Sequence, residues 1–351
     1  MNIEVKRVTD HKHLGLTLDS KLSFVKHITE KIGNARKGIG IIKHLFTYLP
    51  LKTRDQIFKM HIRPHLDYCD MIYHVPVKTR EMSNFDCSRT LQYLMKLLES
   101  TQYQAALAVS GAWKGTSREK IYEELGWESL DHRRTFRRLT QFYKIMNGLT
   151  PGYLKIPALS LRSHLFGLGN DLKNIPSKTQ RYGNSFFPDT VSLWNDLGPK
   201  LRGSESLAVF KRNLLKLYRP PKKSLFDIYD VGIKWIFQLR VGLSPLRSHK
   251  RAHKFEDTPS AICNCRLKTA ETTCHFLINC PNFVNPRKIL FATINPILLK
   301  YTTRFLEDNS LLQLLLYGDE KFKLEDNQNI LKATIKFIRD SSRFSQIKMV
   351  H

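Results

Sequence analysis

The chain has 351 residues, of which 42% are hydrophobic and 25% charged, a globular composition that excludes wholesale disorder and a collagen-like repeat. Lysine and arginine number 57 against 31 aspartates and glutamates, which gives a formal net charge of +26. Because this excess is far larger than solubility requires, we expect a polyanionic partner.

The positive charge is concentrated in one part of the chain. Between Arg202 and Lys254 there are thirteen basic residues and three acidic ones, whereas nine basic and seven acidic residues follow from Lys300 onwards. A generally basic, solvated surface is the alternative interpretation, but the concentration favours a binding surface.

Cysteine usage and the absence of apolar segments indicate the compartment. Four of the six cysteines fall within eighteen residues, a clustering more typical of a metal site than of a disulfide framework. The first twenty residues lack the apolar stretch of a secretory signal, and the apolar run Leu311 to Tyr317 is shorter than the ~18 residues that cross a bilayer. We therefore expect an intracellular protein, in the nucleus or cytoplasm, with reduced thiols and no membrane segment.

The N-terminal third begins with strand signals and continues with helices. The segment Leu14 to Leu18 predicts one or two strands, ending near Asp19. From residue 25 the apolar residues recur at spacings of three and four, which places them on one helix face: Val25, Ile28, Ile32, Ala35, Ile39, Ile42 and Phe46. A second helix is predicted over about 53–63, ending before Pro64.

The next helices are predicted over about 91–108, over 118–125 with Ser117 as N-cap, and from Asp131, which can cap the next one. In that last helix the basic residues lie off the apolar stripe. A solvated face is the ordinary interpretation, but in so basic a chain we assign the row to phosphate contacts: Arg133, Arg134, Arg137 and Arg138.

The second half begins with an irregular stretch. Residues 151–223 are punctuated by proline and glycine, which predicts an extended connector with one helix over about 207–217. A capping box at Ser224 and Asp227 predicts a helix to about Val241, and further helices are expected from Pro286 onwards. Basic residues flank this helix and are further candidates for phosphate contacts: Lys222, Lys223, Arg247, Lys250, Arg251 and Lys254.

The sharpest chemical signal is a set of soft and borderline ligands. Cys263, Cys265, His275 and Cys280 supply three thiolates and one imidazole, the donors that tetrahedral zinc prefers, and the His-x4-Cys half has the spacing of a zinc knuckle. Buried thiols without a metal are the alternative, and Cys274 is a competing ligand. His275 and Cys280 are five residues apart, so on a regular helix their side chains would point about 140° away from each other. For both to bind one metal ion, one of them should lie at a helix end.

Catalytic motifs are missing from the sequence. Two-metal polymerase or nuclease chemistry needs clustered carboxylates, and the chain has no Asp-Asp pair. The nearest approach, Asp67 and Asp70, is interpreted as a turn or helix end after Pro64. There is also no Gly-rich phosphate loop with Lys-Ser/Thr and no Gly-x-Ser-x-Gly elbow, so we expect no enzyme activity of the chain on its own.

Several separated blocks of the chain form a specific combination: Lys12-His13-Leu14-Gly15-Leu16 with residues 18–24 and His27-Ile28, Arg63-Pro64-His65-Leu66-Asp67-Tyr68, residues 182–188 with Leu193-Trp194-Asn195, Leu239-Arg240-Val241-Gly242-Leu243, and the cysteine cluster ending at residues 274–281. Together these blocks resemble the C-terminal region of reverse transcriptases from non-LTR retrotransposons.

The resemblance implies a mainly α protein in five parts: a primer-grip-like strand segment (1–22), a helical thumb-like domain (23–150), a connector (151–223), a basic helix with a CCHC zinc knuckle (224–290), and a C-terminal helical tail (291–351). It implies that Leu14 and Gly15 position a primer end. The family's catalytic aspartates lie upstream of the primer grip and would precede residue 1, and Cys274 stands where the family usually has a polar residue.

Two functions follow as alternatives. The first is a nucleic-acid-binding fragment that contacts template RNA or DNA through its basic surface and zinc knuckle. Phe276 and Phe283 could stack on unpaired bases, with packing in the core as the alternative interpretation of both rings. The second is a zinc-stapled protein-interaction or scaffold protein with no nucleic-acid role.

Overall fold

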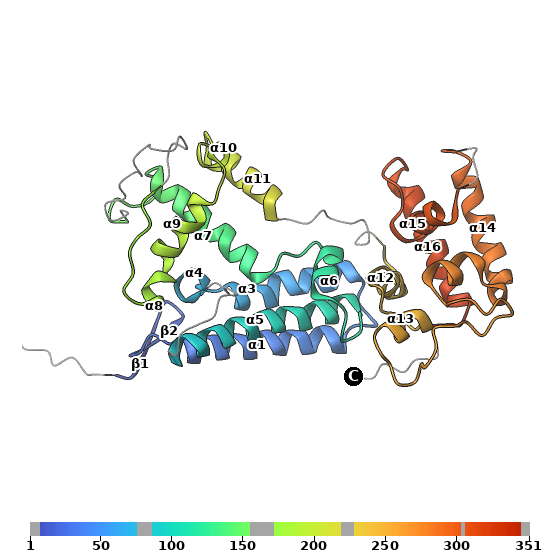
Figure 1. The fold of residues 1–351 in the computed structure, drawn as a ribbon, viewed down its shortest axis with the longest axis horizontal. Coiled ribbons are helices and arrows are strands. Elements are labelled where there is room, and N and C mark those ends of the chain that lie inside the picture. The colour runs from blue at the N-terminus through green and yellow to red at the C-terminus, as the bar shows by residue number, and fades with distance from the viewer. Residues whose placement is uncertain (1–7, 76–85, 155–171, 219–227, 303–305, 345–351) are drawn as a thin grey trace, which may run out of the picture. The chain divides into compact units, whose positions relative to one another are not determined.

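The computed structural model describes residues 8–75, 86–154, 172–218, 228–302 and 306–344, and is mainly helical with one short two-stranded sheet, as the sequence predicts (Figure 1). The strands are β1 (Asp10–His13) and β2 (Leu16–Asp19). The α-helices are α1 (Val25–His44), α2 (Leu51–Ile57), α3 (Arg63–Asp67), α4 (Asp70–Tyr73), α5 (Asp86–Ser110), α6 (Arg118–Leu125), α7 (Leu130–Met146), α8 (Gln180–Gly183), α9 (Phe186–Asn195), α10 (Pro199–Arg202), α11 (Leu207–Tyr218), α12 (Ile233–Val241), α13 (Arg247–Ala252), α14 (Val284–Leu298), α15 (Asp308–Tyr317) and α16 (Leu324–Asp340). Two π-helical turns, η1 (Phe58–Ile62) and η3 (His275–Asn279), and the 3-10 turn η4 (Pro281–Phe283) complete them.

The chain groups into two compact units, each assembled from three segments. Unit 1 comprises residues 1–39, 59–104 and 127–220, and unit 2 comprises residues 40–58, 105–126 and 221–351. This grouping differs from the five consecutive segments expected from the sequence, because α1 and α5 each supply residues to both units.

The N-terminal sheet of unit 1 is a tight hairpin. β1 and β2 pair antiparallel with His13 opposite Leu16, and Leu14 and Gly15 form the two-residue turn with φ values of 45° and 81°. Two successive positive φ values define the turn whose twist suits a two-residue hairpin. Leu14 and Gly15 were predicted to lie in a strand, and this is wrong because they form the turn. The Leu14 carbonyl in this turn accepts a hydrogen bond from the Tyr68 hydroxyl.

The long helix α1 follows the predicted apolar row, and Ile28, Ile32 and Ile42 are buried on it. Its start is fixed by Asp19, whose carboxylate accepts hydrogen bonds from the backbone N–H groups of Ser23 and Phe24 at 2.9–3.0 Å. A carboxylate at this end also complements the helix dipole.

The chain does not leave the helical conformation before Pro64. It continues from α2 through η1 into α3, where Pro64 lies within the first two helical positions. The N–H groups at a helix start have no intrahelical acceptor, so a proline there removes no hydrogen bond.

The caps of the next two helices were predicted with mixed success. Ser117 caps α6, where its hydroxyl accepts from the Lys120 N–H at 3.4 Å, as predicted. The cap of α7 is Ser129, whose hydroxyl accepts from the His132 N–H at 3.2 Å, and not Asp131.

The stretch predicted as a connector contributes to a core. Its described residues, 172–218, form four helices instead of one, and α9 and α11 pack on α7. The buried side chains of this core are Leu139, Phe142, Tyr143, Leu172, Val191, Trp194, Leu197, Phe210 and Leu214. Helices this short present too few turns for a periodic pattern to stand out.

In unit 2 the C-terminal helices form a layer of their own. α14 runs along α16, α15 also packs on α16, and α12 contacts α6, α15 and α16 (Figure 1). α12 ends at Val241 as predicted, while the expected capping box at Ser224 and Asp227 lies outside the described residues. Among the described helices, none has both the length and the apolar character needed to traverse a bilayer.

Candidate metal centre and basic helix

A small irregular hairpin positions the first two candidate ligands. Ile262 and Ala270 form an isolated antiparallel bridge, and the Cys263 N–H donates to the Thr269 carbonyl at 2.8 Å. The loop between the arms closes through Lys268, which has a φ of 48° and donates to the Cys265 carbonyl at 3.2 Å. Cys263 and Cys265 therefore lie on one arm, and both are buried.

A π-helical turn positions the other two. The Cys280 N–H donates to the His275 carbonyl, five residues earlier, at 2.6 Å, and Cys280 ends the turn. In a regular α-helix, residues five apart diverge, but a turn closed by an i→i+5 bond returns them to the same side. Cys280 thus lies at a helix end, as the spacing predicted.

The four ligand atoms fit a tetrahedral zinc ion. With Zn–S near 2.3 Å and Zn–N near 2.0 Å, a tetrahedron has S···S edges of about 3.8 Å and S···N edges of about 3.5 Å. The Cys263 and Cys280 sulfurs are 3.8 Å apart, the Cys265 sulfur lies 3.4 Å from the His275 Nε2, and all four atoms lie within 4.8 Å of one another. The geometry and the donor set are compatible with zinc.

Backbone N–H groups point at each sulfur. The Cys263 sulfur receives the N–H of Cys265, and the Cys280 sulfur receives the N–H of Asn282. For Cys265, burial acts to raise the pKa, but N–H groups of the following loop and the neighbouring thiols outweigh it, so its pKa lies below the ordinary value. Such donors favour the thiolate, the form that binds metal. At Cys263 and Cys280, however, burial outweighs them and raises the pKa, to about 12 for Cys280.

The imidazole is oriented for metal binding through one nitrogen. Thr269 Oγ1 lies 3.1 Å from the His275 Nδ1, on the side away from the sulfurs. A hydrogen bond from Nδ1–H to this hydroxyl leaves Nε2 as the lone-pair donor that faces Cys265.

The centre is attached to the helical layer by an aromatic cluster. Phe276, fully buried, lies with its ring centroid 5.1–5.5 Å from those of Phe283, Phe337 and Phe344. Phe276 therefore belongs to the core and is not available to stack on a base, and Phe283 packs beside the cysteines. Arg287 donates from Nη2 to the Cys280 carbonyl at 2.8 Å.

Glu271 connects the loop 261–280, which carries the four candidate metal ligands, to the basic helix α13. Its carboxylate, which is buried, accepts the Arg247 N–H at 2.7 Å and pairs with the Arg343 guanidinium at 2.7–2.8 Å. Its own carbonyl accepts from the Ser248 hydroxyl at 2.6 Å. No short-range pattern in the sequence signals this role, because Arg343 lies 72 residues away.

The basic residues predicted around α13 lie on or just beyond that helix, and no residue of α13 is buried. Arg247 donates from Nη1 to the Ile262 carbonyl at 3.3 Å, and Lys250 pairs with Asp257. Arg251 and Lys254 are exposed, and within the described part of the chain neither has a carboxylate partner. Lys222 and Lys223 lie outside the described residues.

The basic row on α7 has a different place from the one predicted. Arg133, Arg134 and Arg138 are buried, at 1% exposure for the last two, so the prediction that they face solvent is wrong. Arg138 pairs with Asp189 at 2.6 Å and donates to the His74 carbonyl at 2.7 Å.

Asp67 and Asp70 neutralise the rest of that row. Asp67 ends α3 and Asp70 begins α4, which confirms the helix-end interpretation. Arg137, partly exposed, lies 3.0 Å from Asp67 and 2.7 Å from Asp70, while Arg133 lies 2.9 Å from Asp67. Guanidinium groups therefore pair with both carboxylates. In the described residues, the only group of three or more potential metal ligands is the Cys3His set.

Leu14 is 82% exposed at the hairpin turn, and Gly15 packs against Tyr68, whose hydroxyl would lie 2.7 Å from an added Cβ. Cys274 is outside the ligand group and only partly exposed, with the Asn279 amide 3.8 Å from its sulfur.

Comparison with known proteins gives no relative. No protein-family model matches the chain, no curated protein matches it, and no solved structure matches it.

Proposed function

We propose that the chain is a zinc-dependent nucleic-acid-binding protein, similar to the C-terminal region of a non-LTR retrotransposon reverse transcriptase. It binds RNA or a template–primer duplex through backbone phosphates and has no polymerase activity of its own. The observation that supports this best is the direct connection between the Cys3His cluster and α13 through Glu271. The concentration of positive charge around α13 supports it further.

Zinc in this centre would have a structural role. Four protein ligands complete the tetrahedral shell and leave no position for water or substrate. The protein residues would then position the nucleic-acid-binding surface. The four ligands would fix the conformation of the loop 261–280, and Glu271 holds the start of α13 against that loop.

The test measures zinc content and nucleic-acid affinity of the purified chain at 50 mM and 200 mM salt. We expect one zinc per chain and, for about four phosphate contacts, a slope of log K against log salt of about −3.6 on duplex DNA. Cys280→Ala should lose zinc and weaken binding, whereas Cys274→Ala, the matched control, should keep both. Absence of zinc together with absence of salt-dependent binding would refute the proposal.

One observation favours the protein-interaction alternative. A groove of about 410 Å³ runs between α14 and α16, and its apolar lining includes Ile289, Ile297, Ala333 and Phe337. A protein partner seated there would bind with little dependence on salt, so the same titration separates the two functions.

A further inference from the structure

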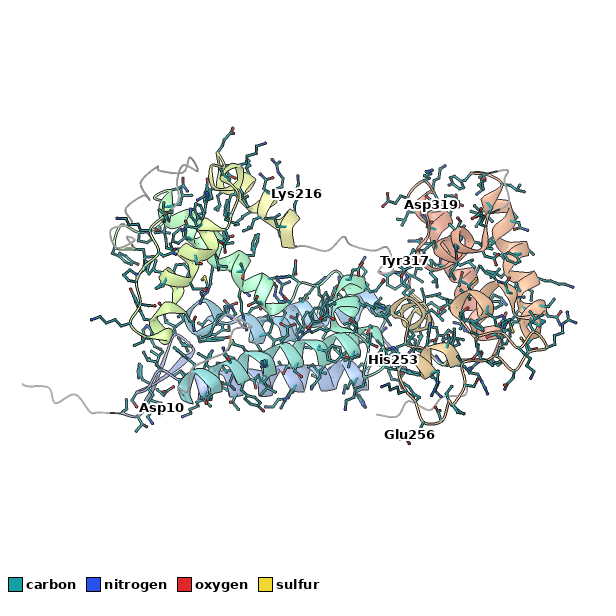
Figure 2. All side chains as sticks on the ribbon, viewed as in Figure 1. Asp10, Lys216, His253, Glu256, Tyr317 and Asp319 are labelled. Carbon is teal, nitrogen blue, oxygen red and sulfur yellow. The ribbon has the colours of Figure 1, made fainter. Side chains whose placement is uncertain are left out.

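A surface hollow of about 510 Å³ opens directly after α13. It is lined by Arg251, Ala252, Lys254, Phe255, Glu256 and Pro259. Glu256 is labelled in Figure 2, on the loop that follows α13. The lining thus combines two exposed cations, one exposed carboxylate and one aromatic ring.

The end of α13 builds this hollow. The Phe255 N–H donates to the Lys250 carbonyl and the Lys254 N–H to the Arg251 carbonyl, both at 3.0 Å, and Lys254 has a φ of 56°. This pair of bonds around a left-handed residue is the Schellman ending of a helix. It turns the chain sharply, so that Lys254 and Phe255 project beside the last turn of the helix.

The Phe255 ring is held in place from within unit 2. Its centroid lies 5.8 Å from that of Trp113 at an interplanar angle of 46°, and the Lys250 ammonium lies 5.7 Å from it. Phe255 is half-buried, and the surface that remains lines the hollow. A rigid, partly exposed aromatic beside cations is the arrangement that single-strand-binding proteins use for bases.

We propose that this hollow takes one unpaired base of a single-stranded nucleic acid, stacked on Phe255, with Arg251 and Lys254 on the flanking phosphates. The inference deepens the proposed function and rests on it. A paired base is stacked within its duplex and presents no free face, so the hollow selects single strands.

The first test compares three probes of equal length: an oligothymidylate, the same strand with abasic sites, and a blunt duplex. The native chain should prefer the oligothymidylate to the abasic strand. Phe255→Leu should lower oligothymidylate affinity about 5- to 150-fold and abolish that preference, while Phe255→Tyr, which keeps the aromatic face, should retain it. Duplex affinity should stay unchanged in both variants.

The second test removes the charge of Lys254. Lys254→Gly also relieves the strain of the left-handed backbone there, which has a φ of 56°, so the variant should fold. It should lower single-strand affinity by about 5-fold at 0.1 M salt for one phosphate contact, whereas the control Lys254→Arg, which keeps the charge, should bind like the native chain.

The outcomes separate the two claims. Equal binding of the oligothymidylate by the native chain and Phe255→Leu would overturn the base site, while steep salt-dependent duplex binding would still uphold the proposed function. No binding to any probe would overturn both.

Discussion

Buried polar residues of unit 1 make its stability depend on pH, and His74 is the clearest case. Burial lowers the pKa of His74 to about 4, although Asp131, 3.3 Å from its Nε2, acts in the opposite direction. The Nδ1 of His74 lies 3.3 Å from the Arg134 guanidinium. In the charged imidazolium this nitrogen would carry a proton that faces another donor and finds no acceptor.

Because the unfolded chain binds a proton near pH 6.5 and the folded chain only near pH 4, stability should fall as the pH drops through this window. The loss amounts to about 3 kcal/mol for this residue. Urea midpoints measured from pH 7 to 4 check it. His74→Gln, which stays neutral throughout, should flatten the profile over that range, and an unchanged profile would contradict the assignment.

Glu271 supports a second prediction at the residue scale. Removing its charge leaves Arg343 without its bidentate partner and the start of α13 with a weaker acceptor. Glu271→Gln should therefore destabilise unit 2 by about 3 kcal/mol and weaken nucleic-acid binding. The same exchange at the exposed Glu256 should leave stability unchanged, and equal effects in thermal melts would remove the special role of Glu271.

At the scale of elements, α7 and α13 are both basic, but their charges serve different purposes. Arg138 on α7 is buried against Asp189, so Arg138→Ala leaves an uncompensated carboxylate and should cost unit 1 about 3–5 kcal/mol. Arg251 on α13 is exposed, so Arg251→Ala should leave stability unchanged and reduce the salt slope by about 1. Denaturant titration and binding measured on both variants check this contrast.

How far each helix was predictable from the sequence follows from where its partners lie. The apolar row of α1 is a local pattern, so it was predicted nearly to its ends. The row of arginines on α7 is also local, but their partners Asp67, Asp70 and Asp189 lie about 50 to 70 residues away. A periodic pattern counts arginine as polar and therefore assigned buried residues to the surface.

The same distinction applies to the site. The four candidate ligands lie within eighteen residues, so their spacing alone grouped them, and the structure confirms that they come together. The connecting position of Glu271 was missed because it depends on Arg343, and the ring contact of Phe255 was missed because it depends on Trp113; both partners are distant in sequence. The sequence left base stacking and core packing both open for Phe276, since the aromatic partners that place it in the core lie on α16 and beyond it.

At the scale of the whole molecule, each unit has its own core and its own ionic cluster, and the Cys3His centre belongs to unit 2 alone. Metal removal should therefore act on one unit. Without zinc, three thiols and an imidazole remain buried with no common partner, and the loop 261–280 loses its crosslink.

We expect chelation, or Cys280→Ala, to abolish hydrogen-exchange protection at 261–283 and to reduce it in α13, which Glu271 ties to that loop. Protection in α16 should fall less, because Phe337 contacts Phe276 but also belongs to the packing between α16 and α14. Amides of α7 should keep their protection, since its core lies in unit 1.

Hydrogen exchange followed by mass spectrometry resolves these segments, with Cys274→Ala as the control that should match the native chain. Loss of protection in α7 on metal removal would show that the two units unfold together and that the zinc centre supports both.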